Sequence, residues 1–434
     1  MSADITKLPN GLTIVSHHMP HLETVSLGVW VAAGARHETA AENGISHLLE
    51  NMAFKGTAKR TARDIAEEIE QVGGELNAAT SLETTAYYAR VLKGDEGVAI
   101  DILADILLSS SYAELELERE REVILQEIAG IKDSPDELAY DLLQDAAFPD
   151  QPVGRPIIGT PESVTGFTAS ELRRFLGQRY VAPSMVVSAA GAVVHDDLVR
   201  HVEALFGTLN GGRGSKPGVA VQAGGQFALE AASYAGGVRS SDKAFEQSHL
   251  VLGFDGPSYR DPDFFTAQVF SGLMGGGMSS RLFQEVRENR GLCYAIYSSA
   301  WGLTDGGMFT VHAATGADVM GELVDVVAGE IRRAANEAPA AVEVARAKAQ
   351  LKAGLLMGLE SSSARAEQMA RHMLAYGRLL TSQELIARVD AVTPEAVSTF
   401  AAAMVQRARP SIAVVGAGER SAHWADLAHR QLSS

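Results

Sequence analysis

A short stretch of polar residues near the start of the chain has the spacing of a metal site. His47, Glu50 and Asn51 occupy positions i, i+3 and i+4, so a helix through them places all three on one face. The preceding turn, with Asn43 or Ser46 as the expected cap, predicts such a helix. Two imidazoles at i and i+4 of a helix bind Zn²⁺, and the carboxylate between them lies beside the bound water. Here the fifth position carries an amide instead of the second imidazole.

A strongly acidic segment offers further carboxylates. Residues 114–127 read ELELEREREVILQE, and Glu120 and Glu127 are seven residues apart, which is two turns along one helical face. On the functional interpretation, Glu127 is a metal ligand and Glu120 orients the site. A solvated acidic helix would show the same spacing, and a capped amphipathic helix with one polar histidine would account for His47.

Two residues of the second half could contact a peptide. The glycine run 275–277 is expected to open a helix that Gly291 ends, and a strand is expected at 292–297. Arg287 near the end of that helix and Tyr294 in the strand could hydrogen-bond a peptide carbonyl. The alternative is a surface arginine and a half-buried core tyrosine. The glycine run lacks the G-x-x-x-x-G-K-[ST] pattern, so nucleotide binding is not expected.

These residues belong to a chain that has the pattern of an α+β fold. Long amphipathic helices are predicted at 62–72, 95–109 and 114–133, and they alternate with strands. This pattern predicts helices packed on mixed or antiparallel sheets. A Gly/Pro/Ser-rich segment near the midpoint predicts a linker. The expected organisation is an N-terminal zinc-site domain at 1–209, a linker at 210–226 and a homologous C-terminal domain at 227–434.

Parallel features in the two halves indicate duplication. In each half a threonine starts a helix with a phenylalanine seven residues on, a Pro-Ser pair precedes a short apolar strand, and a glycine lies eight residues beyond that proline. The corresponding pairs are Thr168 and Thr393, Phe175 and Phe400, Pro183 and Pro410, and Gly191 and Gly418. Two such halves can enclose a central cavity in which a ligand binds.

The bulk composition restricts the class of protein. The 434 residues exceed the size of one core, and 46% hydrophobic and 21% charged residues are ordinary for a globular chain. A net charge of −17 argues against nucleic-acid binding. It fits cationic partners such as basic peptides, and it fits equally well a charge that only keeps the protein soluble. No apolar run reaches the length of a membrane span. The chain begins without a secretory signal and has one cysteine, Cys293, in an apolar run, so we expect a cytoplasmic protein without a catalytic thiol.

Taken together, these segments resemble the pitrilysin-type inverzincin peptidases of family M16, with the processing-peptidase-like branch as the nearest likeness. The family motif H-x-x-E-H falls on His47 to Asn51, and the family's glutamate ligand falls on Glu127, 76 residues after Asn51. A further family glutamate falls on Glu120, and the arginine and tyrosine pair falls on Arg287 and Tyr294. The family's edge strand, which holds substrate by β-augmentation, matches a segment that includes Gly74, Leu76, Asn77 and Ala78.

The resemblance implies a role for each position. His47 and Glu127 would bind one zinc ion, and position 51 would supply the second imidazole. Glu50 would be the general base toward the zinc-bound water and then the acid toward the leaving amine. Arg287 and Tyr294 would hold the substrate, an extended and basic peptide cleaved inside a closed chamber. A homodimer or a heterodimer with a related subunit is the expected assembly.

Asn51 leaves two interpretations of the chain open. Because an amide oxygen is a poor replacement for imidazole at Zn²⁺, zinc binding and hydrolysis are expected to be weak or absent. Either one change has disabled an active endopeptidase, or the chain is a non-catalytic scaffold or partner subunit, of a processing-peptidase-like or a respiratory core complex. The other expected site residues, from Glu50 to Tyr294, are all in place, which favours the single change.

Overall fold

The computed structural model describes residues 3–209 and 229–433. The described chain forms two compact units. Unit 1 consists of residues up to Ile128 together with 156–230 and 357–379, and unit 2 consists of 129–155, 231–356 and 380 onward. The predicted linker at 210–226 lies outside the described residues.

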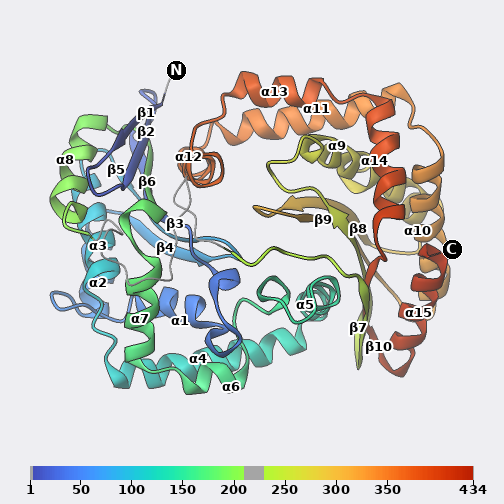
Figure 1. The fold of residues 1–434 in the computed structure, drawn as a ribbon, viewed down its shortest axis with the longest axis horizontal. Helices are drawn as coiled ribbons and strands as arrows, with labels where there is room; N and C mark the ends of the chain where they lie inside the picture. Colours follow the sequence, from blue (N-terminus) through green and yellow to red (C-terminus); the bar gives the residue numbers. More distant parts are fainter. Residues whose placement is uncertain (1–2, 210–228, 434) are drawn as a thin grey trace. The chain divides into compact units, whose positions relative to one another are not determined.

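Unit 1 is built on one mixed sheet (Figure 1). Strand β2 runs parallel to β6, and every other pair of neighbours is antiparallel. The order is β1-β2-β6-β3-β5-β4, with bounds Asp4–Lys7, Thr13–His18, Met185–Gly191, Thr24–Val31, Thr85–Leu92 and Glu75–Thr80. Strand β4 is therefore an edge strand, with a hydrogen-bonded neighbour on one side only.

The helices of unit 1 follow the predicted periodicity. The predicted helices at 62–72, 95–109 and 114–133 are confirmed as α2, α3 and α4, within one residue at each end. The helices in chain order are α1 Ile45–Met52, α2 Ala62–Gln71, α3 Glu96–Leu108, α4 Glu114–Asp133, α6 Pro161–Gly166, α7 Ala169–Arg179, α8 His195–Phe206 and α12 Ser362–Tyr376. Helix α4 begins in unit 1 and ends in unit 2.

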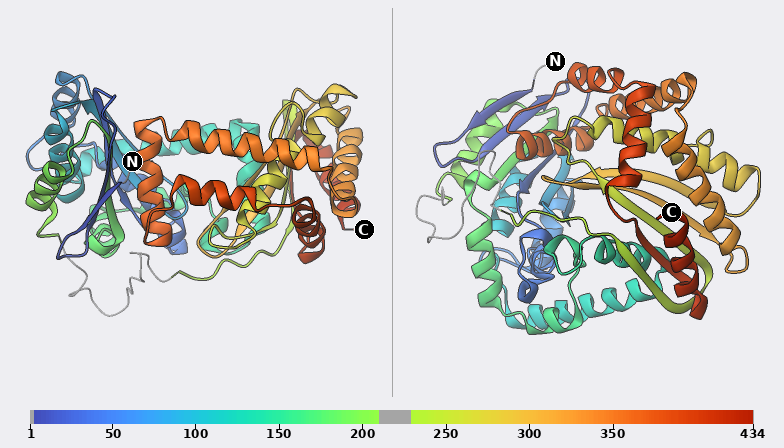
Figure 2. Two further views of the ribbon diagram at one scale, coloured as in Figure 1. Left: turned by 90° about the horizontal axis from the view of Figure 1, so that it is seen from above. Right: turned by 45° about the vertical axis from the view of Figure 1, so that its right-hand side comes forward.

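Both faces of the unit 1 sheet are buried. Alternation along β6 sends Val187 into the core beneath α3 and α8, while Val186 points to the opposite face. That opposite face is covered by α12, whose Met369 packs in one cluster with Trp30 and Val15. Figure 2 shows α12 beside these strands from a second side. A helix from the second half of the chain thus completes the core of unit 1.

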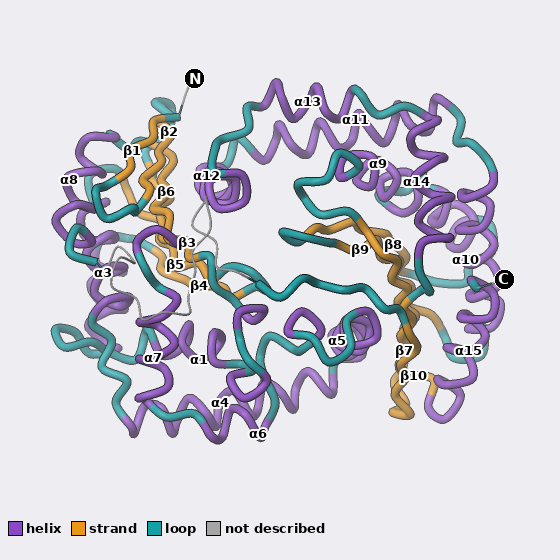
Figure 3. The backbone as a smooth tube through the Cα atoms, viewed as in Figure 1, coloured by secondary structure: helices purple, strands orange, loops and turns teal. Residues whose placement is uncertain are grey.

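Unit 2 is built on the sheet β10-β7-β9-β8, with bounds Ser411–Ala417, Gly237–Gly256, Gly307–Thr315 and Ala295–Gly302 (Figure 3). Strand β7 is long enough to flank β10 twice. Its residues 237–240 pair with β10 in parallel, and its residues 249–253 pair with β10 in antiparallel register. Strand β10 therefore has a parallel neighbour and an antiparallel neighbour, as β6 has in unit 1.

Helices also cover both faces of the unit 2 sheet. Phe254 and Phe309 pack with Phe270 of α9 and, through it, with Phe400 of α14. On the other face, α5 places Leu143 against Gly253, where a Cβ atom would lie 3.4 Å from the leucine methyls. The helices are α5 Pro135–Ala147, α9 Phe264–Gly275, α10 Met320–Asn336, α11 Ala341–Gly358, α13 Ser382–Asp390, α14 Pro394–Arg407 and α15 Ser421–Leu432, with a π-helical turn at Phe283–Glu288.

The predicted α+β fold with two homologous domains is confirmed. Thr168 and Thr393 both cap their helices through the side-chain oxygen. The equivalent glycines are, however, Gly191 and Gly416, not Gly191 and Gly418. Both have positive φ, and a Cβ atom would lie 2.2 Å from the Thr24 carbonyl oxygen and 2.3 Å from that of Gln247. Gly418 instead follows β10 at the start of a short helical turn.

Each compact unit includes one helix from the other half of the sequence. Helix α5 precedes the midpoint yet belongs to unit 2, and α12 follows it yet belongs to unit 1. The domains predicted at 1–209 and 227–434 group α5 with the N-terminal half and α12 with the C-terminal half. Amphipathic periodicity shows that a helix has an apolar face, but it does not show which sheet buries that face. Of the helices described, none is long and apolar enough to cross a bilayer.

Candidate functional site

Helix α1 is held by a carboxylate from outside the helix. Gly44, with φ of 94°, precedes it without a side-chain cap. The buried Glu38 accepts hydrogen bonds from the backbone N–H groups of Gly44 and Ser46, both at 2.8 Å. The expected cap was wrong, because Asn43 donates to the Pro156 carbonyl and the Ser46 hydroxyl has no partner within the described structure. Helix α1 therefore begins at a site fixed by tertiary contacts.

The apolar face of α1 fixes the direction of its polar face. Leu48, Leu49 and Met52 are almost fully buried in a cluster with Leu117 and Ile124 of α4. The three residues predicted for the site, His47, Glu50 and Asn51, are each half-buried. Burial of the leucines and the methionine thus positions the polar groups of α1 beside α4.

The structure brings His47 and Glu127 together. The His47 Nε2 atom lies 3.9 Å from Oε2 of Glu127, and their side chains are 19% and 46% exposed. The other nitrogen of this imidazole, Nδ1, is buried without a hydrogen-bond partner in the described chain. The spacing between α1 and α4 therefore suits an ion bound between an imidazole and a carboxylate.

Carboxylates dominate the electrostatics of this region. Burial lowers the pKa of His47, and the charges of Glu50 and Glu120 oppose that shift. Burial also raises the pKa of Glu127, and the charge of Glu120 raises it further. Glu120 is buried and pairs with Lys55 Nζ at 2.6 Å. A neutral imidazole next to several acidic groups is the protonation state that binds a cation.

The donor set fits zinc only in part. Two donors bound to one tetrahedral zinc ion lie roughly 3.3 Å apart, so the 3.9 Å pair needs only a small adjustment. A catalytic zinc has three protein ligands, and Asn51 stands on the helix face where the third is expected. Among the described residues no group of three or more His, Cys, Asp or Glu side chains is arranged to hold a metal ion. His47 and Glu127 are thus two candidate donors, and the described residues do not complete a set of three around them.

The predicted edge strand is confirmed as β4, which packs beside α1. Gly74 precedes β4, and a Cβ atom there would lie 2.9 Å from side-chain atoms of Ile69 and Val91, so glycine allows this turn to pack. Leu76 and Ala78 point toward the core, whereas Asn77 is exposed. An edge strand offers unpaired backbone groups to an extended peptide.

Arg287 and Tyr294 contact each other within unit 2. The Arg287 guanidinium lies between the rings of Phe283 and Tyr294, 4.7 and 4.8 Å from their centroids. Strand β8 begins at Ala295, so the expectation that Tyr294 lies within the strand was wrong. Tyr294 is 77% exposed, which also overturns the alternative of a half-buried core tyrosine. The pair presents a cation and a phenol at the surface.

Cys293 does not have the setting of a nucleophile. Its side chain is buried, and burial raises the pKa of the thiol to about 11. A reactive cysteine needs a lowered pKa and access to solvent. Sequence reasoning missed Glu38 and Lys55, and nothing in the local sequence distinguishes either from an ordinary surface charge.

The comparisons with known proteins decide the family. The family model "Insulinase (Peptidase family M16)" matches residues 13–161, and "Peptidase M16 inactive domain" matches residues 166–351. An uncharacterized zinc protease of Rickettsia bellii is 38% identical over 88% of this chain and 90% of its own length. The chain belongs to peptidase family M16. The resemblance stated from the sequence is confirmed at this level.

Further similar proteins extend this result. The M16 chain is 38% identical to an uncharacterized zinc protease of Streptomyces coelicolor over 95% of this chain and 89% of that protein. Two solved structures share its fold at 20% sequence identity. A peptidase M16 inactive domain from Pseudomonas fluorescens gives a TM-score of 0.86 over 96% of this chain and 98% of its own. A protease from Helicobacter pylori gives 0.84 over 95% and 99%.

Proposed function

We propose that this chain is a zinc endopeptidase of the M16 type whose metal binding and hydrolysis are impaired by Asn51. The observation that carries the proposal is the pairing of His47 on α1 with Glu127 on α4, at 3.9 Å. Asn51, a poor replacement for imidazole, lies one turn beyond His47 on the same helix. Glu50 lies on the same face of α1, one turn beyond His47. The zinc-protease names of the relatives support the same reaction class.

Each residue has a separate role in this proposal. His47 and Glu127 hold the zinc ion. Glu120 pairs with Lys55, and its negative charge raises the pKa of Glu127. Zinc, when bound, polarises a water molecule and the scissile carbonyl. Glu50 accepts a proton and later delivers it to the leaving amine. Arg287 and Tyr294 contact the substrate as a guanidinium and phenol pair.

The proposed substrate is an extended basic peptide. The exposed edge of β4 can add a peptide strand through main-chain hydrogen bonds, with Asn77 and its neighbours along the strand. The net charge of −17 favours cationic peptides over acidic ones. We further propose that the peptide is cleaved inside a closed chamber, as in the processing-peptidase branch.

Asn51 itself favours a second candidate function. A chain that lacks one zinc ligand could serve as a non-catalytic partner or scaffold that binds peptides without cleaving them, as a homodimer or beside a related subunit. The two candidates differ in one property. A disabled peptidase regains zinc and activity when the ligand is restored, whereas a scaffold does not.

The deciding experiment compares this chain with Asn51→His. Zinc content is measured by atomic absorption after dialysis against zinc, and cleavage is measured with a basic fluorogenic peptide. We expect about one zinc ion per chain and cleavage in Asn51→His, and at least roughly tenfold weaker zinc binding in the original chain. An Asn336→His variant, with a histidine at an exposed position at the end of α10, controls for an added imidazole.

The experiment has three possible outcomes. Zinc binding and cleavage that appear only in Asn51→His support the disabled peptidase. Metal-free and inactive protein in both cases would support the scaffold and would remove the catalytic roles of Glu50, Arg287 and Tyr294. Zinc bound equally by both proteins would show that Asn51 is not at a ligand position.

A further inference from the structure

Two polar contacts join the α1 segment to α4, and they follow opposite orders along the two elements. His47 lies 3.9 Å from Glu127, and Lys55, later in the α1 segment, lies 2.6 Å from Glu120, which precedes Glu127 on α4. The two glutamates are separated by about 10 Å along the helix. The two segments therefore run antiparallel, with the candidate metal centre at one contact and an ammonium group at the other. Asn51 lies midway between His47 and Lys55 in the sequence.

The ion pair between Lys55 and Glu120 is partly shielded from water. The two side chains are 33% and 5% exposed. Lys55 follows the end of α1, and its backbone N–H donates to the Met52 carbonyl at 3.2 Å, so a turn fixes the point from which the side chain extends. Water and salt screen such a pair less than a fully exposed one. The charge of Lys55 is therefore felt by the groups around Glu120.

Glutamates outnumber cations around this pair. The charge of Glu120 acts on both His47 and Glu127, and the charge of Glu50 also acts on His47. Within the described chain, Lys55 is the only lysine or arginine that forms an ion pair with one of these three glutamates. The same carboxylates would attract a divalent cation and the Lys55 ammonium, and these two cations would repel each other.

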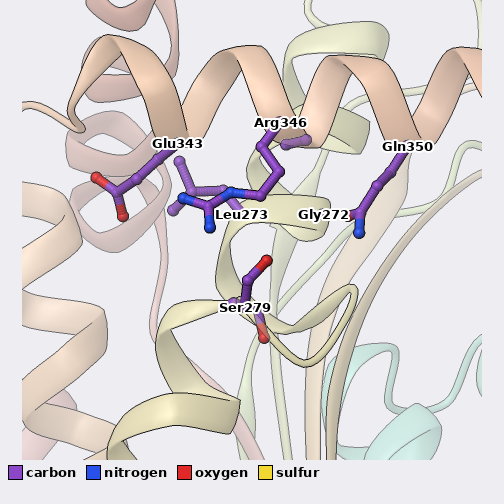
Figure 4. Close-up of a pocket in the computed structure, with 8 residues that line it drawn as sticks. Gly272, Leu273, Ser279, Glu343, Arg346 and Gln350 are labelled. Atoms are coloured by element: carbon purple, nitrogen blue, oxygen red, sulfur yellow. The ribbon is translucent and has the colours of Figure 1, made fainter.

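An ion pair in unit 2 provides a structural comparison. Glu343 extends from α11 at the pocket between α9 and α11 (Figure 4), and it receives two hydrogen bonds from Arg281, at 2.8 and 2.9 Å. This pocket has about 10 Å³ of free space, room for about one water molecule, and its lining includes no histidine and no second carboxylate. Glu343 therefore has the setting of a structural ion pair, whereas Glu120 acts on an imidazole and on a second carboxylate.

We propose that Lys55 is an internal counter-ion of the candidate metal centre. Its ammonium group balances the charge of the glutamates when no metal ion is bound, and it opposes the binding of a divalent cation at His47 and Glu127. Lys55 acts through its charge and through Glu120, so it is a positioning residue and not a ligand. This inference rests on the proposed function, because it concerns how tightly the proposed zinc centre holds its metal.

The test compares Asn51→His with the variant that also carries Lys55→Met, since methionine keeps an unbranched stem without the charge. The zinc dissociation constant is measured by competition with a chromogenic chelator at constant pH and ionic strength. We expect Lys55→Met to bind zinc at least about tenfold more tightly, because a repelling charge is removed. The metal-free variant should unfold at a lower temperature, because Glu120 is left buried without a counter-charge. A lysine with a purely structural role would lower both stability and zinc affinity when replaced.

Two controls in the Asn51→His background match the two effects of this substitution. Lys59→Met removes the same charge from an exposed position nearby, where water screens it, and should leave the zinc dissociation constant unchanged. Arg281→Met breaks the ion pair with Glu343 in unit 2. It should lower the unfolding temperature without changing the affinity for zinc.

A second comparison avoids the unpaired glutamate, in case that group prevents Lys55→Met from folding. Glu120→Gln and the combined Lys55→Met and Glu120→Gln variant differ only in the ammonium group, and the combined variant should bind zinc more tightly. Tighter binding without Lys55 supports the inference. Equal or weaker binding in both comparisons overturns the inference and leaves the proposed function in place. Absence of zinc from Asn51→His itself overturns the proposed function and this inference together.

Discussion

At the residue scale, the role of Glu50 can be separated from metal binding. Glu50 shares a helix face with His47, and the contact that defines the candidate centre joins His47 to Glu127 without it. In the Asn51→His background, Glu50→Gln should therefore keep zinc and lose roughly 10²- to 10⁴-fold in cleavage rate, because it removes the proposed general base. Zinc content and kcat on the same preparation check this expectation.

A neighbouring glutamate provides the control for that variant. Glu118 is an exposed residue of α4, two positions before Glu120, so Glu118→Gln should leave both zinc content and kcat unchanged. If Glu50→Gln releases the zinc as well, Glu50 is a ligand and the assignment of the base is wrong.

At the scale of one element, Glu38 controls the start of α1. Its two carboxylate oxygens accept the N–H groups of Gly44 and Ser46. In Glu38→Gln the amide nitrogen cannot accept a hydrogen bond, so one buried N–H is left unsatisfied at a cost of about 1–3 kcal/mol. The free energy of unfolding from urea denaturation should fall by that amount, and an unchanged value would show that water replaces the lost contact.

The pH dependence of stability gives a second test of Glu38. Burial raises its pKa from 4.5 to about 7, although hydrogen bonds from Ser46 and Gly44 oppose the shift. The native state therefore holds the Glu38 proton more tightly than the unfolded state does, and this tighter binding adds to the free energy of unfolding. The contribution is complete below pH 4.5 and is lost as the pH rises through 7. In Glu38→Gln, the decline in unfolding free energy between pH 5 and 8 should be smaller.

Glu171 is the matched control for this titration. It belongs to the exposed capping box of α7, where hydrogen bonds from Thr168 lower its pKa. Its contribution is lost only as the pH falls below the range from 5 to 8. Glu171→Gln should therefore leave the slope in that range unchanged, and an equal effect of both variants would argue against a special role of Glu38.

At the scale of the whole molecule, the exchange of α5 and α12 makes the core of each unit depend on both halves of the sequence. Met369 of α12 is fully buried against the unit 1 sheet. Met369→Ala should destabilise unit 1 by about 2–5 kcal/mol, since it leaves a cavity in a packed core. Hydrogen exchange should then accelerate in β2 and β6 and not in β9 of unit 2.

An exposed residue on the same helix tests whether the effect comes from burial. Arg371→Ala changes α12 on its solvent side and should leave exchange in β2 and β6 unchanged. Faster exchange in β9 after Met369→Ala would contradict the assignment of α12 to unit 1.

The sequence by itself determined the local elements and the chemical inventory. The bounds of α2, α3 and α4 and the capping threonines of α7 and α14 follow from periodicity and turn residues close along the chain, and the edge strand β4 follows from the family resemblance. The family follows from the ordered spacing of the site motifs, and the comparisons confirm it. Such signals are local, so one sequence is sufficient to show them.

Only the tertiary structure decided which distant groups meet. Lys55 pairs with Glu120, and α12 lies on the unit 1 sheet, because of contacts between residues far apart in the chain. Glu38 lies only six and eight residues before the N–H groups of Gly44 and Ser46, but its burial against them depends on what packs around the turn. The exposure of Tyr294 likewise depends on what packs around it. Which side chains are buried and which are paired depends on how several helices and strands pack together, and a short stretch of sequence does not show this packing.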